Sequence, residues 1–371
     1  MSRLAAFGTR ALPLLAATAF AAPPAPRPLP APFLSGVSFA MTNDSARGYD
    51  SAAARRTLDA LSRGGVTAVS VMPFAFQRTP GDSSLRWRLT HPASESDEQM
   101  TAAIREAKRR GLAVLVKPQV WLRGSWPGEI DPSGPGGFAS WWRDYRAFIL
   151  HHAALAAREK ADGFCVGTEL TRLQGRPEWR ALVEEVRGTF AGFVVYAANW
   201  DALDVPFSDL LDAVGVDLYA PLSADAKAND AVLYEGARGL VARLDALGAK
   251  VMRPVLLTET GFPARPACWT RPHDERGTEA DAEAQRRATH ALLSALETSK
   301  AVRGLFWWKV FSDGECAGEG DGSYRLTGRP AEKELFEFFR RLSHNAQRTT
   351  QNYPGYPPAD DAARRRRGRR A

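Results

Sequence analysis

Two glutamates in this chain each follow a short apolar run. The stretch GFCVGTEL brings Glu169 to the end of one run, and PVLLTETG brings Glu259 to the end of another, each directly after a threonine. Burying an unpaired carboxylate is costly, so a charge at the end of a buried strand indicates a role beyond packing. One such glutamate is often a helix cap or an ion-pair partner, whereas two with the same local sequence favour acid–base or nucleophilic chemistry.

The elements that would position these glutamates repeat along the chain. Apolar runs alternate with segments of helical period, and eight runs lie at 37–41, 66–72, 112–118, 163–167, 193–197, 213–219, 254–258 and 304–308. They are almost continuously apolar, as is typical of parallel strands covered on both faces. The repeat predicts a single (β/α)₈ barrel. An open doubly wound sheet is the alternative, but no run is followed by its G-x-G-x-x-G turn.

In a (β/α)₈ barrel, the loops at the carboxyl ends of the strands form the active face. Aromatic and amide residues follow the runs there, and the candidate substrate-binding residues are Asn43, Gln119, Trp121, Asn199, Trp200, Tyr219, Trp307 and Trp308. Side chains alternate along a strand, so one of Trp307 and Trp308 is expected to point inward and the other toward the helices. Aromatic faces cover the apolar face of a sugar ring and amides bind its hydroxyl groups, so the set predicts an oligo- or polysaccharide ligand.

The two glutamates fit a specific reaction on such a ligand. Carboxyl groups from non-adjacent strands could flank a glycosidic bond, one as proton donor and one as nucleophile, through an oxocarbenium-like transition state. Retention of configuration requires a separation of about 5–5.5 Å. The sequence does not fix that distance.

The motifs at the strand ends resemble those of glycoside hydrolase family 113, within the clan of retaining (β/α)₈ hydrolases. They are GTEL on the fourth run, AANW on the fifth, VDLYAP on the sixth, TETGF on the seventh and GLFWW on the eighth. The resemblance implies that Glu169 is the general acid/base and Glu259 the nucleophile, with Tyr219 hydrogen-bonded to Glu259. It also implies that Trp307 or Trp308 floors the cleavage subsite. Characterised members act on β-1,4-mannan, so the expected activity is that of an endo-β-1,4-mannanase without a metal or cofactor.

One residue departs from the wider clan. Thr168 stands before Glu169, where most clan members carry the asparagine that holds the sugar 2-hydroxyl. Asn199 is expected to take over this contact. The departure leaves another β-glycan open as the substrate. A glycan-binding protein with little or no turnover also stays open, because the presence of both glutamates does not establish their alignment.

Two other barrel enzymes fit the residues less well. A metal-dependent hydrolase needs histidines at strand ends, and none of the six histidines lies immediately there. A Schiff-base aldolase could use Lys117 or Lys309 as the nucleophile. Such an enzyme usually grips a phosphate near the last strands, where the loop carries the phosphate-repelling Asp313, Glu315, Glu319 and Asp321.

The ends of the chain differ from its centre in composition. Residues 1–22 combine Arg3 and Arg10 with an apolar run and no acidic residue, which predicts a signal peptide and export to the periplasm or the medium. Residues 23–32 are expected to be a proline-rich spacer, 33–344 the barrel domain, and 345–371 a basic disordered tail. The leader's apolar run is too short to span a bilayer, and no later segment is a predicted membrane span.

The net charge of +7 belongs to the ends. Six tail arginines and the two leader arginines exceed it, so the folded part is close to neutral and lacks the basic stripe of a nucleic-acid-binding protein. Attraction of the tail to an anionic surface is the alternative to a purely solvated end. We expect a monomer.

The three cysteines divide into two kinds. Cys165 lies inside an apolar run and is predicted to be a packed thiol. Cys268 and Cys316 lie in polar loops, and an exported protein does not usually leave two loop thiols free. We therefore predict a disulfide between them.

Overall fold

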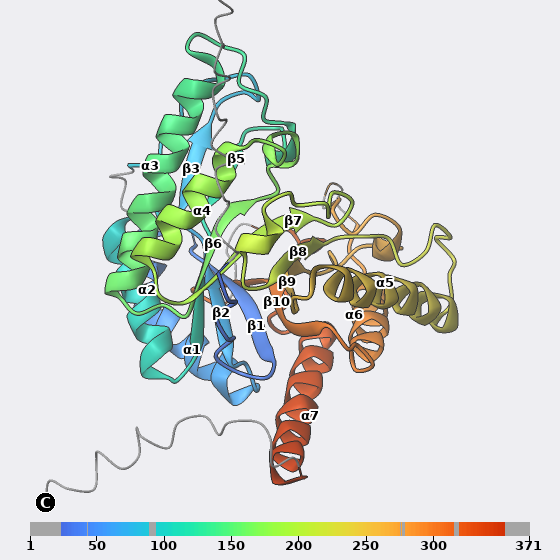
Figure 1. Cartoon of the computed structure of the whole chain (residues 1–371). Coiled ribbons are helices and arrows are strands. Elements are labelled where there is room, and N and C mark those ends of the chain that lie inside the picture. Colours follow the sequence, from blue (N-terminus) through green and yellow to red (C-terminus); the bar gives the residue numbers. More distant parts are fainter. Residues whose placement is uncertain are drawn as a thin grey trace, which may run out of the picture.

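The computed structural model describes residues 24–42, 44–88, 94–274, 276, 279–314 and 319–352, without the side chains of Ser45 and 344–352. Eight parallel strands close into a barrel in the order β1-β10-β9-β8-β7-β6-β4-β2 (Figure 1). They are β1 (Leu34–Ala40), β2 (Ala68–Val71), β4 (Ala113–Val116), β6 (Gly163–Thr168), β7 (Phe193–Asn199), β8 (Val214–Leu218), β9 (Val255–Thr260) and β10 (Val302–Phe311). The predicted single (β/α)₈ barrel is confirmed.

Helices surround this barrel. The α-helices of the described chain are α1 (Ala52–Arg63), α2 (Asp97–Arg109), α3 (Gly137–Arg158), α4 (Glu178–Thr189), α5 (Asp230–Val251), α6 (Ala282–Leu296) and α7 (Pro330–Asn352). Four of them begin where a polar side chain accepts a backbone N–H hydrogen bond, at Ser51, Ser96, Asn229 and Asp281. Between β7 and β8 a short 3₁₀ helix, Ser208–Leu210, takes the place of an α-helix. The last helix, α7, continues beyond residue 344, where the sequence predicted the end of the barrel domain.

The barrel interior changes from apolar to polar along the strands. Near the amino ends, inward side chains such as Leu115, Leu256 and Phe306 form one apolar cluster, and fully buried Cys165 belongs to it as a packed thiol. Two residues further along the strands, on the same face, stand Lys117, Thr258 and Trp308. A larger cluster fills the layer between the barrel and the helices. The strands therefore present apolar residues at one end of the barrel and functional groups at the other.

The proline-rich segment before β1 is bound to the amino-terminal end of the barrel. Leu29 and Ala31 pack against the interior apolar cluster. The backbone N–H of Arg27 donates to Oδ1 of Asp212 at 2.7 Å, and its guanidinium donates to the carbonyl oxygens of Arg187, Phe190 and Gly192. The segment predicted as a spacer thus covers the amino end of the barrel.

A second, smaller sheet extends two of the barrel strands. It pairs β3 (Phe74–Gln77) with β5 (Gln119–Leu122) in parallel. Pro73 and Pro118 precede these strands, and a proline has no N–H to donate to the ladder. Pairing resumes directly afterwards, where Gln119 N donates to Pro73 O at 3.0 Å. This extension, which carries Gln119 and Trp121, was not predicted from the sequence.

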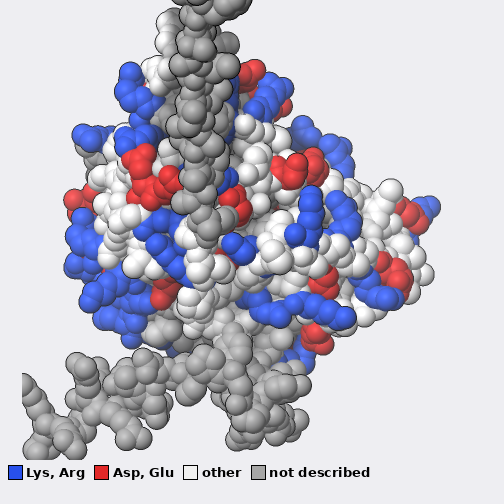
Figure 2. Space-filling model, in the orientation of Figure 1, with Lys and Arg blue, Asp and Glu red and all other residues white. Residues whose placement is uncertain are grey.

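The predicted signal peptide, and the predicted tail beyond residue 352, lie outside the described residues. On the face of the molecule drawn in Figure 2, basic and acidic side chains are interspersed. Within the described chain, every helix falls short of the combined length and hydropathy that a bilayer crossing requires.

Candidate active site

A cavity of about 940 Å³ opens at the carboxyl ends of the barrel strands. Eight of the ten predicted catalytic and substrate-binding residues line it, namely Gln119, Trp121, Glu169, Asn199, Trp200, Tyr219, Glu259 and Trp308. Of the other two, Asn43 lies outside the described residues. The remaining one, Trp307, does not reach the cavity.

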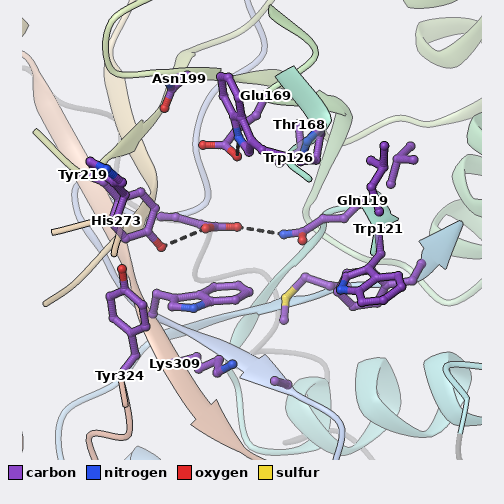
Figure 3. Close-up of a pocket in the computed structure, with 18 of the residues that line it drawn as sticks. Gln119, Trp121, Trp126, Thr168, Glu169, Asn199, Tyr219, His273, Lys309 and Tyr324 are labelled. Carbon is purple, nitrogen blue, oxygen red and sulfur yellow. Dashed lines mark hydrogen bonds between the residues drawn. The ribbon is translucent and has the colours of Figure 1, made fainter. Parts of the chain in front are cut away.

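The carboxylate of Glu259, on β9, accepts hydrogen bonds from three side chains. Lys117 Nζ and Gln119 Nε2 donate to its Oε1, the latter at 2.7 Å. The hydroxyl of Tyr219 donates to its Oε2 at 2.9 Å, and Figure 3 draws the Gln119 and Tyr219 bonds as dashed lines. A carboxylate anion accepts on both oxygens and is favoured by an adjacent cation. Three donors, one of them a cation, therefore occupy both oxygens of Glu259.

A buried ion pair lies behind Glu259. Lys117 and Asp217 are both fully buried, with Lys117 Nζ 3.1 Å from Asp217 Oδ2, and Thr258 Oγ1 donates to Asp217 Oδ1 at 2.7 Å. Burial alone would lower the pKa of Lys117, but the negative charges of Asp217 and Glu259 raise that pKa above its ordinary value. The amine is thus held protonated, which removes the free nucleophile that the aldolase alternative would need from Lys117.

The second carboxyl group, that of Glu169, has a different environment. It follows β6 with a left-handed backbone, φ 53°, that a non-glycine residue adopts at a cost. Its Oε2 accepts a hydrogen bond from Trp126 Nε1 at 2.6 Å. Burial, assisted by the negative charges of Asp217 and Glu259, raises the pKa of Glu169 to about 8, against the opposing effects of Trp126 and Lys117. Glu169 is therefore protonated at neutral pH.

The cavity thus holds two carboxyl groups in different environments. Glu169 carries a proton, and Glu259 is surrounded by donors that suit an anion. Environments that separate two carboxyl groups in this way assign one to acid catalysis and the other to nucleophilic or electrostatic work.

The two tryptophans at the end of β10 face opposite ways. Trp308 lines the cavity. Trp307 is fully buried and its ring lies 6.2 Å from that of Phe262, in the layer between barrel and helices. The candidate role of Trp307 in substrate binding is therefore wrong, because strand alternation turns it away from the cavity. On the extension sheet, Trp121 is 46% exposed and lies 5.6 Å from Phe76.

The polar residue at the end of β7 also reaches the cavity. Asn199 lines it and donates from Nδ2 to Asp201 Oδ1 at 2.6 Å. The neighbouring Thr168 uses its hydroxyl to donate to the carbonyl oxygen of Pro118 at 3.1 Å. The hydroxyl of Thr168 therefore donates to the barrel framework, and Asn199 supplies an amide to the cavity from the end of the neighbouring strand.

Several cavity residues were not predicted as site residues. They are Glu95, Trp126, His273, Lys309 and Tyr324, and they come from loops or, for Lys309, from the end of β10. Burial raises the pKa of Glu95 to about 7. Lys309 pairs with Glu319 at 2.6 Å and lies 5.2 Å from the ring centre of Trp308. Trp126 could have been suspected as an aromatic residue in the loop sequence GSWPG. Its hydrogen bond to Glu169 could not be predicted from that loop.

The predicted disulfide is not formed at Cys268. This residue is a free thiol, only 4% exposed, and belongs to the apolar layer around the barrel, while Cys316 lies outside the described residues. The loop that carries Cys268 folds back onto the protein, so the residue packs as a small hydrophobic side chain.

One group of possible metal ligands occurs among the described residues, away from the cavity. Atoms of Asp97, His151 and His152, on α2 and α3, lie within 4.8 Å of one another. His151 Nε2 is already 2.8 Å from Asp97 Oδ1.

Comparison with known proteins identifies the family. The model of Glycoside Hydrolase Family 113 matches residues 37–329, which is most of the chain. The chain belongs to glycoside hydrolase family 113. It is accordingly a glycoside hydrolase, and the family predicted from the strand-end motifs is confirmed.

Solved structures share the fold of this family 113 protein. A structure described as a complex of a GH113 β-1,4-mannanase is 23% identical with a TM-score of 0.72, covering 83% of this chain and 99% of that one. The GH113 β-mannanase AaManA from Alicyclobacillus acidocaldarius, in complex with ManMIm, is 24% identical with a TM-score of 0.74, covering 84% and 98%. A GH5_18 variant from Streptomyces cattleya, in complex with Manβ1-4GlcNAc, is 20% identical with a TM-score of 0.58, covering 84% and 81%. A comparison with curated proteins gives no match.

Proposed function

We propose that this family 113 glycosidase is an endo-β-1,4-mannanase that retains configuration, with Glu259 as nucleophile and Glu169 as general acid/base. The observation that carries the proposal is the difference between the two carboxyl groups. Glu169 keeps a proton because burial raises its pKa to about 8, whereas Glu259 receives donors from Lys117, Gln119 and Tyr219. A retaining glycosidase needs these two states at the same pH.

In the first step, a carboxylate oxygen of Glu259 attacks the anomeric carbon of the sugar. The bond from this carbon to the glycosidic oxygen breaks, and the proton of Glu169 passes to the leaving oxygen. The product is a glycosyl ester of Glu259, with Glu169 now ionised.

In the second step, a water molecule attacks the same anomeric carbon from the side that the leaving group vacated. Glu169 takes a proton from this water, and the bond from the anomeric carbon to Glu259 breaks. Both glutamates return to their starting states, and the sugar keeps its configuration because the carbon is inverted twice.

Mannan as the substrate is supported by the cavity and by two similar solved structures. Trp121 and Trp308 offer aromatic faces to sugar rings, and two of the neighbours described above are named as β-mannanases. Because Thr168 donates to the carbonyl of Pro118, Asn199 is the residue proposed to hold the sugar 2-hydroxyl. The configuration at this carbon distinguishes mannan from glucan.

The test begins with the wild-type chain on mannan, glucomannan, xylan and mixed-linkage glucan, with analysis of the products. Internal cleavage of mannan at the highest kcat/KM is the expected result. Equal turnover of all four polymers, or release of single sugars from chain ends, would contradict the assigned substrate or the endo action.

The roles of the two glutamates are tested by Glu169→Ala and Glu259→Ala, with exposed Glu129→Ala as the control. Both active-site variants should lose turnover while still binding manno-oligosaccharides. The control variant should keep both turnover and binding. Azide should rescue Glu169→Ala and give a β-glycosyl azide, because azide can attack the ester without base catalysis. Equal trace activity in the wild type and both active-site variants, with binding intact, would indicate a glycan-binding protein.

A further inference from the structure

A buried cation lies between two carboxylates at the floor of the active site. Lys117 Nζ contacts Glu259 Oε1 on one side and lies 3.1 Å from Asp217 Oδ2 on the other. Lys117 and Asp217 are fully buried and neither lines the cavity, so Asp217 does not touch a substrate held there. Any effect of Asp217 on the reaction must pass through its neighbours.

The proposed reaction changes the charge on one side of this cation only. When Glu259 becomes a glycosyl ester, its negative charge is consumed, while Lys117 keeps its positive charge. An isolated buried charge is strongly unfavourable, whereas a paired one is tolerated. In the ester state, Asp217 is the carboxylate still in contact with Lys117.

The other titratable groups around Asp217 do not supply this negative charge. Burial raises the pKa of Cys165 to about 11 and the pKa values of Tyr196 and Tyr219 above their ordinary range, so all three are neutral. Glu169 donates its proton in the first step and becomes an anion, but it is hydrogen-bonded to Trp126, whereas Lys117 is hydrogen-bonded to Asp217.

Asp217 also responds to the charge on Glu259. Burial raises the pKa of Asp217 to about 7, Lys117 opposes the rise, and the negative charge of Glu259 adds to it. Once Glu259 is esterified, this last contribution disappears, while the anion now on Glu169 acts on Asp217 in the same direction. The contact with Lys117 at 3.1 Å favours the ionised form of Asp217. The hydroxyl of Thr258, which donates to Asp217 Oδ1 at 2.7 Å, supports the same form.

We propose that Asp217 is a positioning residue that balances the charge of Lys117 while Glu259 is esterified, and so stabilises the glycosyl-enzyme intermediate. This inference rests on the proposed function and adds the assignment of one buried carboxylate to one step. Without Asp217, ester formation leaves a buried unpaired cation, whereas ester hydrolysis restores the Lys117–Glu259 pair. Loss of Asp217 therefore slows formation and leaves hydrolysis unchanged or faster.

The experiment separates these two steps with 2-deoxy-2-fluoro-β-mannobiosyl fluoride. Its reaction with the enzyme gives the rate of ester formation, and recovery of activity after removal of excess reagent gives the rate of ester hydrolysis. For Asp217→Asn, formation should slow by about tenfold to a hundredfold, with no slowing of hydrolysis. Mass spectrometry of the labelled peptide locates the ester.

The matched control is Asp212→Asn at the opposite end of the barrel. Asp212 is likewise fully buried and paired with a cation, since Arg187 Nη1 lies 2.8 Å from its Oδ1. This variant should lose stability without changing the ratio of the two rates. Thr258→Val removes only the hydroxyl donor of Asp217 and should slow formation by a few-fold, which keeps the test available if Asp217→Asn does not fold.

A double variant tests the route of the effect. If Asp217 acts through Lys117, Asp217→Asn should have no further effect on ester formation in a Lys117→Met background. If Asp217→Asn slowed ester formation and ester hydrolysis equally, or changed neither rate, the inference would be overturned while the proposed function would stand. Absence of a label on Glu259 in the wild type would instead overturn the proposed function.

Discussion

The indole Nε1 of Trp126 lies 2.6 Å from Oε2 of Glu169. An indole N–H can donate but not accept, so Oε2 is the acceptor. Because a carbonyl oxygen accepts more strongly than a hydroxyl oxygen, the contact favours the proton of the neutral carboxyl group on Oε1. Trp126 comes from the loop between β5 and α3 and lines the cavity.

The first prediction is that Trp126→Phe moves the alkaline limb of the pH profile. The hydrogen bond from Trp126 lowers the pKa of Glu169, so its removal should raise that pKa above about 8. The alkaline limb of kcat/KM should shift to higher pH, and the maximal rate should fall by roughly tenfold as the acid loses its orientation. Trp121→Phe is the control, because Trp121 also lines the cavity but the indole bonded to Glu169 is that of Trp126, so the limb should stay in place.

The second prediction concerns stability and pH. Glu169 has a pKa of about 8 in the folded state, against an ordinary value near 4.5. Between these values the folded state holds a proton that the unfolded state has released, so the free energy of unfolding falls as pH rises and levels off above pH 8. Glu169→Gln should flatten this dependence. Relative to the wild type, its free energy of unfolding should rise by at most about 1.4 kcal/mol for each pH unit between these two pKa values. If the free energy of unfolding changed between pH 5 and pH 8 by the same amount in the wild type and in Glu169→Gln, this assignment would be contradicted.

The third prediction separates the two tryptophans of β10. Trp308→Ala removes a wall of the cavity and should raise KM for manno-oligosaccharides about tenfold or more, with little change in melting temperature. Trp307→Ala removes a fully buried ring and should lower the free energy of unfolding by about 3–5 kcal/mol. Below its unfolding temperature, the Trp307 variant should keep a normal KM. If instead Trp307→Ala raised KM and Trp308→Ala lowered the free energy of unfolding, Trp307 rather than Trp308 would be the residue that faces the cavity.

The fourth prediction is that Arg27→Ala destabilises the barrel without altering catalysis. The change removes the guanidinium donors to three carbonyl oxygens of the α4–β7 region. We expect a loss of about 2 kcal/mol in the free energy of unfolding, with kcat/KM unchanged at low temperature. Exposed Arg56→Ala is the control and should change stability by less than about 0.5 kcal/mol.

The sequence was most informative about the barrel strands and about the residues at their ends. Continuous apolar runs located all eight barrel strands, and the residues after them included Glu169, Tyr219 and Glu259, which line the cavity. Period-two alternation also required that one of Trp307 and Trp308 be buried. It did not say which, because the starting face of a strand is set by its neighbours in the barrel.

Contacts between segments far apart in the chain could not be predicted from the sequence. Lys117 and Asp217 are 100 residues apart, and each stands in or beside an apolar run. The bond from Trp126 to Glu169 depends on how a loop crosses the cavity, and the burial of Cys268 depends on a loop that folds back. The extension strands β3 and β5 follow prolines, which sequence rules treat as strand ends.

The anchoring of Arg27 has a consequence for the order in which the chain folds. Its backbone partner, Asp212, stands 185 residues later in the sequence. Arg27 and Asp212 therefore cannot meet until the chain has been made at least as far as residue 212. Until then the amino end of the growing barrel lacks the cover that the proline-rich segment provides.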